Sequence, residues 1–189
     1  KDSKVIIDTC DIMMNRHKLT NSTSWWSFSE KLERKLCQEN NLVPIVEPEV
    51  LINGDHSIET CDKVTRDTLK CLFDELMTVN IYYPGVILKP SMVISGDKNS
   101  KRANYETVAE MTVNCLKEMC PNDLGGIAFL SGGQSNDEAT NHLRIINSGN
   151  FDLPWRVTFS YARAIQQSAL NKWSGKDENH DEAQAILSE

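Results

Sequence analysis

The stretch GVILKPSMV (residues 85–93) places a lysine at the end of an apolar run and a proline directly after it. Three apolar side chains precede Lys89, and Pro90 fixes the backbone behind it. Short runs rich in Val, Ile and Leu are typical of strands buried on both faces of a parallel sheet. The stretch therefore predicts a buried strand that carries an amino group at its carboxyl end.

Three further stretches have the same character: LVPIVEPE (residues 42–49), GGIAFLSGG (residues 125–133) and WRVTFSYAR (residues 155–163). Helical patterns separate them. The alternation of strand and helix predicts parallel strands joined by right-handed crossovers.

The predicted helices cover residues 57–80, residues 105–119, a segment from Ser135 to about Asn147, and a segment that follows Ser160. Ser135 and Glu138 have the spacing of a capping box. The charged stretch GKDENHDE predicts a solvated linker into a short terminal helix. The inner faces of the first and fourth helices are predicted to carry Ile58, Cys61, Val64, Leu69, Leu72, Phe73 and Leu76, and Ala164, Ile165, Ala169 and Leu170, respectively.

The strand ends recur at intervals of roughly 30 to 40 residues, which fits successive units of an α/β barrel with insertions. A doubly wound open sheet is the alternative. The sequence contains neither the G-x-G-x-x-G nor the G-x-x-x-x-G-K-[ST] loop that such sheets use for nucleotides. We therefore predict a barrel.

The chain has 189 residues, of which 40% are hydrophobic and 25% are charged, so one ordinary globular domain is expected. No apolar run approaches the roughly 20 residues of a membrane span, and the first residues lack a signal-peptide pattern. We expect a cytoplasmic protein without a membrane partner. The net charge of -7 disfavours nucleic acid, whereas a small anion needs only a local cationic pocket.

The six cysteines form no C-x-x-C pair, and several lie in helical patterns, so free thiols are favoured over disulfides. The four histidines are scattered and lack the close spacing of zinc ligands. No metal site is expected.

Polar residues follow the predicted strands, and in α/β barrels the carboxyl ends of the strands share one rim where the active site lies. A lysine there is partly desolvated, which lowers its pKa and frees an amine that can attack a carbonyl. The alternative for Lys89 is a salt bridge to a glutamate at the barrel mouth. The rim positions are Glu47, Glu49, Lys89, Ser131, Gly132, Gly133, Ser160 and Arg163.

Glu47 and Glu49 stand two apart on one strand, so both side chains are expected on the same face. One carboxylate could stay ionised beside Lys89 while the other moves protons at a raised pKa. Alternatively, both glutamates only neutralise Lys89 and Arg163.

The LSGGQS stretch offers glycines and backbone amides for an anion, with a helix amino terminus close behind. Arg163, one strand later, would add a bidentate cation for a phosphate. A tight turn is the alternative for the two glycines alone. Together with Arg163, the stretch favours phosphate binding.

Four motifs, LVPIVEPEVL, GVILKPSMV, IAFLSGGQS and TFSYARA, occur in the order and with the spacing found in class I fructose-bisphosphate aldolase. The chain resembles that family from about residue 37 to its end. The resemblance implies the carboxyl-terminal half of a (β/α)8 TIM barrel. Residues 1–189 would form a single domain in which 1–36 are an unfamiliar leader and 37–189 the half-barrel.

The resemblance implies that Lys89 forms a Schiff base with the substrate ketone, without a metal or other cofactor. Glu47 would be the general acid and base, and Glu49 would hold the charge balance. A substrate phosphate would be bound by Ser131, Gly132, Gly133, Ser160 and Arg163.

The implied enzyme is a lyase of glycolysis that reversibly cleaves fructose 1,6-bisphosphate to dihydroxyacetone phosphate and glyceraldehyde 3-phosphate. It would be a cytoplasmic homotetramer whose ligands are sugar phosphates. The alternatives are a non-catalytic aldolase-like protein that binds sugar phosphates or acts as a scaffold, and another lysine-based aldolase.

Several positions depart from the family. Ala162 stands where the family has glycine and Ser91 where it has asparagine, and the terminal tyrosine is absent. Counting back without gaps places Ile6, Ile7 and Asp8 on the strand that carries K-W-R in the family. A fragment, an incomplete gene model, an imperfectly assigned sequence or a true half-sized descendant would each explain this. Because half a barrel exposes sheet edges, we expect a fragment or a faulty record rather than a working half-barrel.

Overall fold

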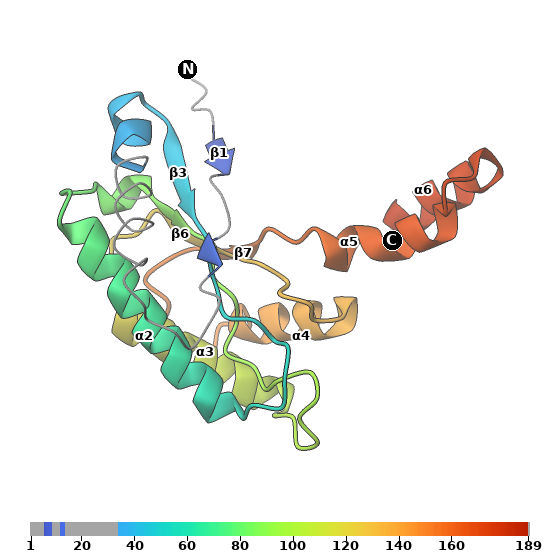
Figure 1. The fold of residues 1–189 in the computed structure, drawn as a ribbon, viewed down its shortest axis with the longest axis horizontal. Helices are drawn as coiled ribbons and strands as arrows, with labels where there is room; N and C mark the ends of the chain where they lie inside the picture. Colours follow the sequence, from blue (N-terminus) through green and yellow to red (C-terminus); the bar gives the residue numbers. More distant parts are fainter. Residues whose placement is uncertain (1–5, 9–11, 14–33, 189) are drawn as a thin grey trace.

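The computed structural model describes residues 6–8, 12–13 and 34–188, and its centre is a five-stranded parallel sheet (Figure 1). The strand order is β1-β3-β5-β6-β7, and a second parallel pair joins β2 to β4. The strands are β1 Ile6–Asp8, β2 Ile12–Met13, β3 Val43–Val46, β4 Pro48–Glu49, β5 Ile87–Leu88, β6 Gly126–Phe129 and β7 Val157–Phe159.

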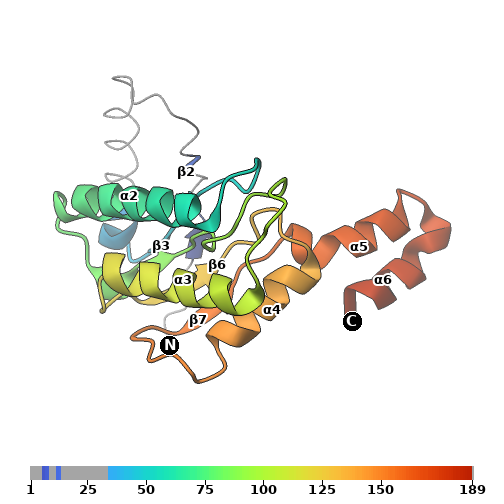
Figure 2. The ribbon, with the colours of Figure 1, turned by 90° about the horizontal axis from the view of Figure 1, so that it is seen from below.

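The strand order confirms the predicted parallel topology. In the main sheet Ile45 lies opposite Ile87, and Ile127 lies opposite Val157. A doubly wound sheet reverses its order at a switch point, whereas the strands of this sheet follow the chain order throughout. Right-handed crossovers then place the connecting helices on one face. Figure 2 shows α2, α3 and α4 side by side along that face.

The helices begin and end close to their predicted positions. Ser57, Asn104 and Ser135 cap α2, α3 and α4, and the capping box of Ser135 and Glu138 is complete. The helices are α2 Ile58–Met77, α3 Tyr105–Met119, α4 Asn136–Ile146, α5 Arg163–Trp173 and α6 His180–Ser188, with short 3-10 turns η1 Tyr83–Gly85 and η2 Asp177–Asn179.

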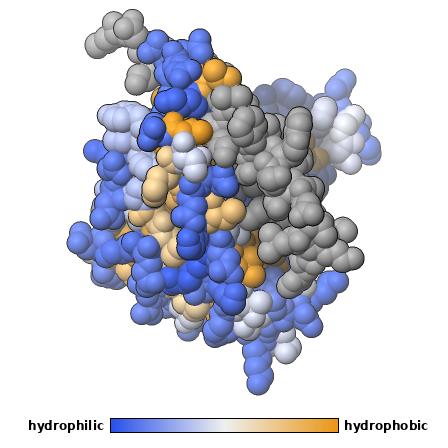
Figure 3. All heavy atoms as spheres, turned by 60° about the vertical axis from the view of Figure 1, so that its left-hand side comes forward, coloured by the Kyte–Doolittle hydropathy of each residue, from blue (hydrophilic) through white to orange (hydrophobic). Residues whose placement is uncertain are grey.

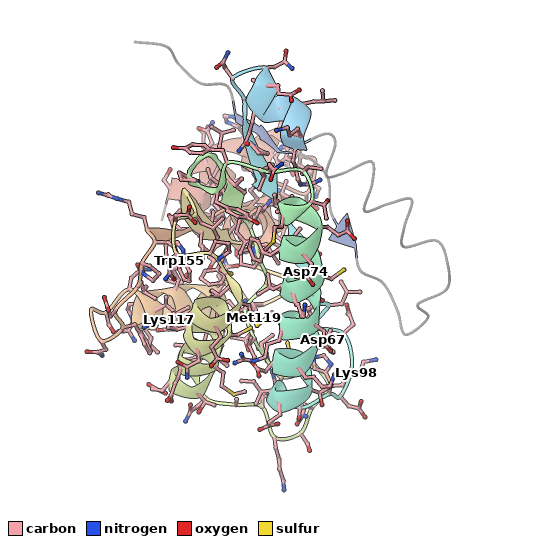
Figure 4. All side chains as sticks on the ribbon, turned by 90° about the vertical axis from the view of Figure 1, so that its left-hand side faces the viewer. Asp67, Asp74, Lys98, Lys117, Met119 and Trp155 are labelled. Atoms are coloured by element: carbon pink, nitrogen blue, oxygen red, sulfur yellow. The ribbon has the colours of Figure 1, made fainter. Side chains whose placement is uncertain are left out.

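Buried side chains from the sheet and from α2 and α3 form the core. Each such side chain contributes about 1.5 to 3 kcal/mol through its removal from water. The outer face of α2 carries Asp67 and Asp74 (Figure 4), which pair with Lys63 and Lys70. The surface in Figure 3 is accordingly mostly hydrophilic. The core includes Val46, Leu69, Phe73, Leu88, Val113, Leu116, Ile127 and Phe129.

The predicted inner face of α2 is wrong at one position. Val64 is 40% exposed, whereas Thr65 and Thr68 are buried. The Thr65 hydroxyl donates to the carbonyl oxygen of Cys61 at 2.8 Å, which satisfies the hydroxyl inside the core.

The prediction for α5 is half wrong. Ala164 and Ala169 are buried, but Ile165 and Leu170 are exposed. The reason is that α5 packs mainly against α6 (Figure 1), and the two helices extend away from the sheet. The prediction assumed that α5 packs on the sheet, and it therefore placed Ile165 and Leu170 in the interior.

The loops that follow β4 and β5 approach each other closely, and we call this contact the loop interlock (residues 52–56 with 96–99). Gly96 N–H donates to the His56 carbonyl at 3.0 Å, and Gly54 N–H donates to Asp97 Oδ1 at 2.8 Å. A Cβ atom on Gly96 would lie 2.2 Å from the carbonyl oxygen of Gly54. The interlock therefore requires glycine at position 96.

The structure describes part of the predicted leader. The strand at residues 6–8 is present, and it pairs with β3 as the strand that precedes it in the sheet. Residues 34–39 are helical. Cys10, Trp25 and Trp26 lie outside the described residues. Within those residues, no helix has the length and apolar character of a membrane span.

The free-thiol prediction is confirmed for Cys61, Cys71, Cys115 and Cys120. Burial raises the pKa of the Cys115 thiol to about 12 and also raises the pKa of Cys120. These two thiols are therefore protonated and unreactive at neutral pH.

Candidate active site

Lys89 and Glu47 meet at the carboxyl edge of the sheet. Lys89 follows β5 and Glu47 follows β3, and Lys89 N–H donates to the Val46 carbonyl at 2.7 Å, which extends the pairing of these two strands. Lys89 Nζ lies 3.1 Å from Glu47 Oε1, and the two side chains are 12% and 11% exposed. A largely desolvated amine thus has a carboxylate within reach for proton transfer.

Glu49 is held by Ser91, which lies on the neighbouring chain segment two residues after Lys89. Ser91 N–H donates to the Pro48 carbonyl at 3.3 Å, and Val50 N–H donates to Ser91 Oγ at 2.9 Å. Buried Ser91 therefore binds the backbone on both sides of Glu49. The hydroxyl fixes the position of Glu49 relative to Lys89.

Replacing Ser91 with alanine is expected to lower the free energy of unfolding by about 1 to 2 kcal/mol, because the Val50 N–H loses its acceptor. Urea unfolding of the full chain measures this change. The matched control is Ser188→Ala, because Ser188 is an exposed serine near the end of α6. Equally small changes in the free energy of unfolding in both variants would show that the Ser91 hydroxyl does not stabilise the backbone around Glu49.

The SGG stretch forms a turn directly after β6. Gln134 N–H donates to the Ser131 carbonyl at 3.0 Å, and Ser131 is buried. Gly132 and Gly133 have φ values of 57° and 85°, a conformation that favours glycine. A Cβ atom on Gly132 would lie 3.9 Å from Glu49 Oε1, so the turn is next to Glu49.

Ser160 and Arg163 occupy different positions relative to this turn. Ser160 N–H donates to the Phe129 carbonyl at 2.8 Å, which places Ser160 beside the end of β6. Arg163 begins α5 and is exposed. Among the residues that the structure describes, no hydrogen bond or ion pair joins its guanidinium to the turn.

Two hollows lie away from Lys89. The first, of about 150 Å³, lies between the loop after β4 and α2, and the second, of about 210 Å³, lies between α4, β7 and α5. Neither includes a predicted site residue. Their walls are formed by Val50, Leu51, His56, Thr60, Cys61 and Val64, and by Thr140, Leu143, Phe159, Tyr161, Ala164 and Ile165.

The described residues contain no group of three His, Cys, Asp or Glu side chains arranged to hold a metal ion. The chemistry that the site can support comes from an amine, two carboxylates and backbone amides. An amine beside a carboxylate can form an imine with a ketone, and a glycine turn ahead of a helix can bind a phosphate.

A family model for class I fructose-bisphosphate aldolase matches residues 15–189. The chain belongs to the class I fructose-bisphosphate aldolase family. The match begins before residue 37, where the resemblance of the motifs begins.

Two curated relatives illustrate the similarity. A probable class 1 fructose-bisphosphate aldolase of Xanthomonas campestris pv. campestris is 53% identical over 157 residues, which are 82% of this chain and 46% of the relative. The cytosolic fructose-bisphosphate aldolase 4 of Arabidopsis thaliana is 46% identical over 149 residues, which are 79% of this chain and 38% of the relative. The chain thus spans less than half the length of these aldolases.

A solved aldolase structure confirms the fold. The Plasmodium falciparum fructose-bisphosphate aldolase, crystallised with TRAP and a small-molecule inhibitor, has a TM-score of 0.81 and 38% identity. The alignment covers 98% of this chain and 52% of that one. The sheet of this aldolase-family chain is therefore part of a (β/α)8 barrel, as the sequence predicted.

Some residues around the site were not predicted from the sequence. The sequence marked Ser91 only as a departure from the family and did not predict its hydrogen bonds on both sides of Glu49. Gln134 and His142 form a buried hydrogen bond behind the glycine turn, and Arg102 pairs with Glu138 at 2.5 Å. None of these residues carried a sequence signal that links it to its partner, because only the fold brings them together.

Proposed function

We propose that the protein that contains this chain reversibly cleaves fructose 1,6-bisphosphate to dihydroxyacetone phosphate and glyceraldehyde 3-phosphate. The observation that carries the proposal is the buried pair of Lys89 and Glu47 at the carboxyl edge of the sheet. The glycine turn beside Glu49, with the amino terminus of α4 behind it, offers a place for a phosphate that a salt bridge alone would not explain. Membership of the aldolase family supports the same conclusion.

In the proposed mechanism, the unprotonated amine of Lys89 attacks the C2 ketone of the sugar and forms a carbinolamine. Glu47, 3.1 Å from the amine, donates the proton with which the C2 hydroxyl leaves as water. The product of this step is a protonated imine. Its positive charge makes it the acceptor for the electron pair that is released in the next step.

Cleavage then breaks the C3–C4 bond. The electron pair of that bond passes into the iminium and forms an enamine. At the same time the C4 hydroxyl loses its proton, its oxygen becomes the aldehyde oxygen, and the C4–C6 fragment leaves as glyceraldehyde 3-phosphate. The enamine takes a proton at C3, and water hydrolyses the imine to release dihydroxyacetone phosphate and free Lys89. Glu49 keeps a negative charge near the cationic intermediates.

The phosphate of the substrate would bind at the turn after β6. We assign Ser131, Gly132, Gly133 and Ser160 to this site, and Arg163 to the same phosphate. Because Arg163 is exposed at the start of α5, its guanidinium would have to turn toward the bound phosphate.

The wider biological setting follows the family. We propose that the reaction belongs to glycolysis, takes place in the cytoplasm and is carried out by a homotetramer without a metal cofactor. The cytosolic designation of the Arabidopsis thaliana relative supports the compartment.

Reductive trapping tests the proposal. Borohydride added with dihydroxyacetone phosphate should reduce the imine to a stable secondary amine, and peptide mapping should locate the added mass on Lys89. The control omits the sugar phosphate. A chain that binds sugar phosphate but yields no adduct and no cleavage would support the non-catalytic alternative and overturn the proposed mechanism.

A further inference from the structure

A buried histidine on α4 contacts the residue that follows the glycine turn. His142 is 2% exposed, and its Nδ1 lies 2.6 Å from Oε1 of Gln134, which is itself 7% exposed. Gln134 directly follows Gly133 in the chain. The hydrogen bond therefore joins the end of the turn to the body of the helix behind it.

The glycines of the turn have no side chains with which to anchor it. Gly132 and Gly133 both adopt positive φ, so their backbone is fixed only through its neighbours. The Gln134 main chain closes the turn on Ser131, and the Gln134 side chain reaches His142. One residue thus sets the turn and fastens it to α4.

The protonation of His142 suits this contact. Burial lowers the pKa of His142 to about 4, so the ring is neutral at pH 7. Because the Gln134 Oε1 atom can only accept, Nδ1 carries the proton and donates it. The ring packs nearly perpendicular to the ring of Tyr105, with ring centroids 5.0 Å apart.

A second contact holds the same helix start from the side. Glu138 accepts from Ser135 in the capping box and pairs with Arg102 from the segment after β5. The amino terminus of α4 is thereby fixed to the segment that follows Lys89. The turn is therefore linked through the start of α4 to the loop that follows β5.

We propose that His142 is a positioning residue that acts through Gln134 to hold the backbone amides of residues 131–133 where a substrate phosphate binds. The consequence for ligand binding rests on the proposed function, whereas the effect on the turn itself does not. His142 contacts no substrate in this role. Its hydrogen bond only limits the movement of the turn.

Two substitutions distinguish the effect of the hydrogen bond from the effect of side-chain packing. His142→Asn keeps a donor, because the Asn Nδ2 atom can occupy nearly the same place as imidazole Nδ1. His142→Leu keeps apolar bulk and removes the donor. If His142→Leu fails to fold, Gln134→Met removes the acceptor instead and keeps a side chain of similar length.

Amide hydrogen exchange of the full chain tests the positioning without reference to catalysis. His142→Leu is expected to speed exchange of the Gln134 amide, which donates to the Ser131 carbonyl at 3.0 Å, by about tenfold or more, the equivalent of losing one hydrogen bond. His142→Asn should exchange as the unmodified chain does. Unchanged exchange in His142→Leu, or the same acceleration throughout the chain in both variants, would overturn the proposal.

Trapping with two ketones tests the consequence for phosphate binding. In His142→Leu, the concentration of dihydroxyacetone phosphate that gives half-maximal trapping should rise about tenfold, while trapping of unphosphorylated dihydroxyacetone should not change. Equal losses with both ketones would contradict a role at the phosphate. If the unmodified chain traps neither ketone, the proposed function fails, and the exchange experiment still decides the role of His142.

Discussion

Replacing Lys89 with methionine should abolish reductive trapping and lower kcat/KM for fructose 1,6-bisphosphate by at least about a thousandfold. Methionine has a similar length but no amine, so no imine can form. Intact mass after borohydride treatment measures the trapping, and a coupled assay for glyceraldehyde 3-phosphate measures the cleavage. The loss is expected in the full chain under conditions in which the unmodified protein is active.

Two further variants separate catalysis from the salt-bridge interpretation. Lys89→Arg keeps a cation for Glu47 but cannot form an imine, so stability should be largely retained while trapping is lost. Lys117→Met removes an exposed lysine on α3 (Figure 4) and should leave both properties unchanged. Trapping that persists in Lys89→Arg would mean that another lysine is the nucleophile.

Replacing Gly96 with alanine is expected to lower the free energy of unfolding by about 3 kcal/mol. The new methyl group would lie 2.2 Å from the carbonyl oxygen and 2.7 Å from the carbonyl carbon of Gly54. Both atoms belong to the backbone, so no side-chain rotation relieves the clash. The loops after β4 and β5 must therefore separate, and the hydrogen bonds of the loop interlock are lost. Urea unfolding measures the change.

The matched control is Gly126→Ala. A Cβ atom on Gly126 would lie 3.5 Å from the Arg156 carbonyl oxygen, which is an ordinary contact, and neither Gly96 nor Gly126 has a positive φ. The control should alter stability by less than about 1 kcal/mol. If both substitutions change the free energy of unfolding equally, the close approach of Gly96 to the Gly54 carbonyl does not determine the stability of the loop interlock.

The residues at the strand ends could be predicted because their position follows from local pattern and topology. A short apolar run predicts a buried strand, and parallel strands bring their carboxyl ends to one edge. Lys89 and Glu47 therefore had to be neighbours once β3 and β5 were adjacent. Capping residues such as Ser135 were equally accessible, because the capping box is a contact between residues close in sequence.

The features that could not be predicted depend on contacts between distant segments. The exposed faces of α5 follow from its packing on α6, which helical periodicity alone does not reveal. The contact of Arg102 with Glu138 joins the loop after β5 to the first turn of α4, whose relative position exists only in the folded chain. His142 was one scattered histidine in the sequence, and only burial beside Gln134 gives it a role.

The parallel pairing of the main sheet also bears on how quickly the chain can fold. Each pairing from β3 to β7 joins residues on either side of an entire helix, as Ile45 with Ile87 and Ile127 with Val157 illustrate. No strand of this sheet can pair through a hairpin. The entropic cost of closing a long loop therefore opposes every pairing before the stabilising contacts between the strands form. The helices can form in microseconds, whereas the edge that carries Lys89 is complete only after the slow search that aligns β3, β5 and β6.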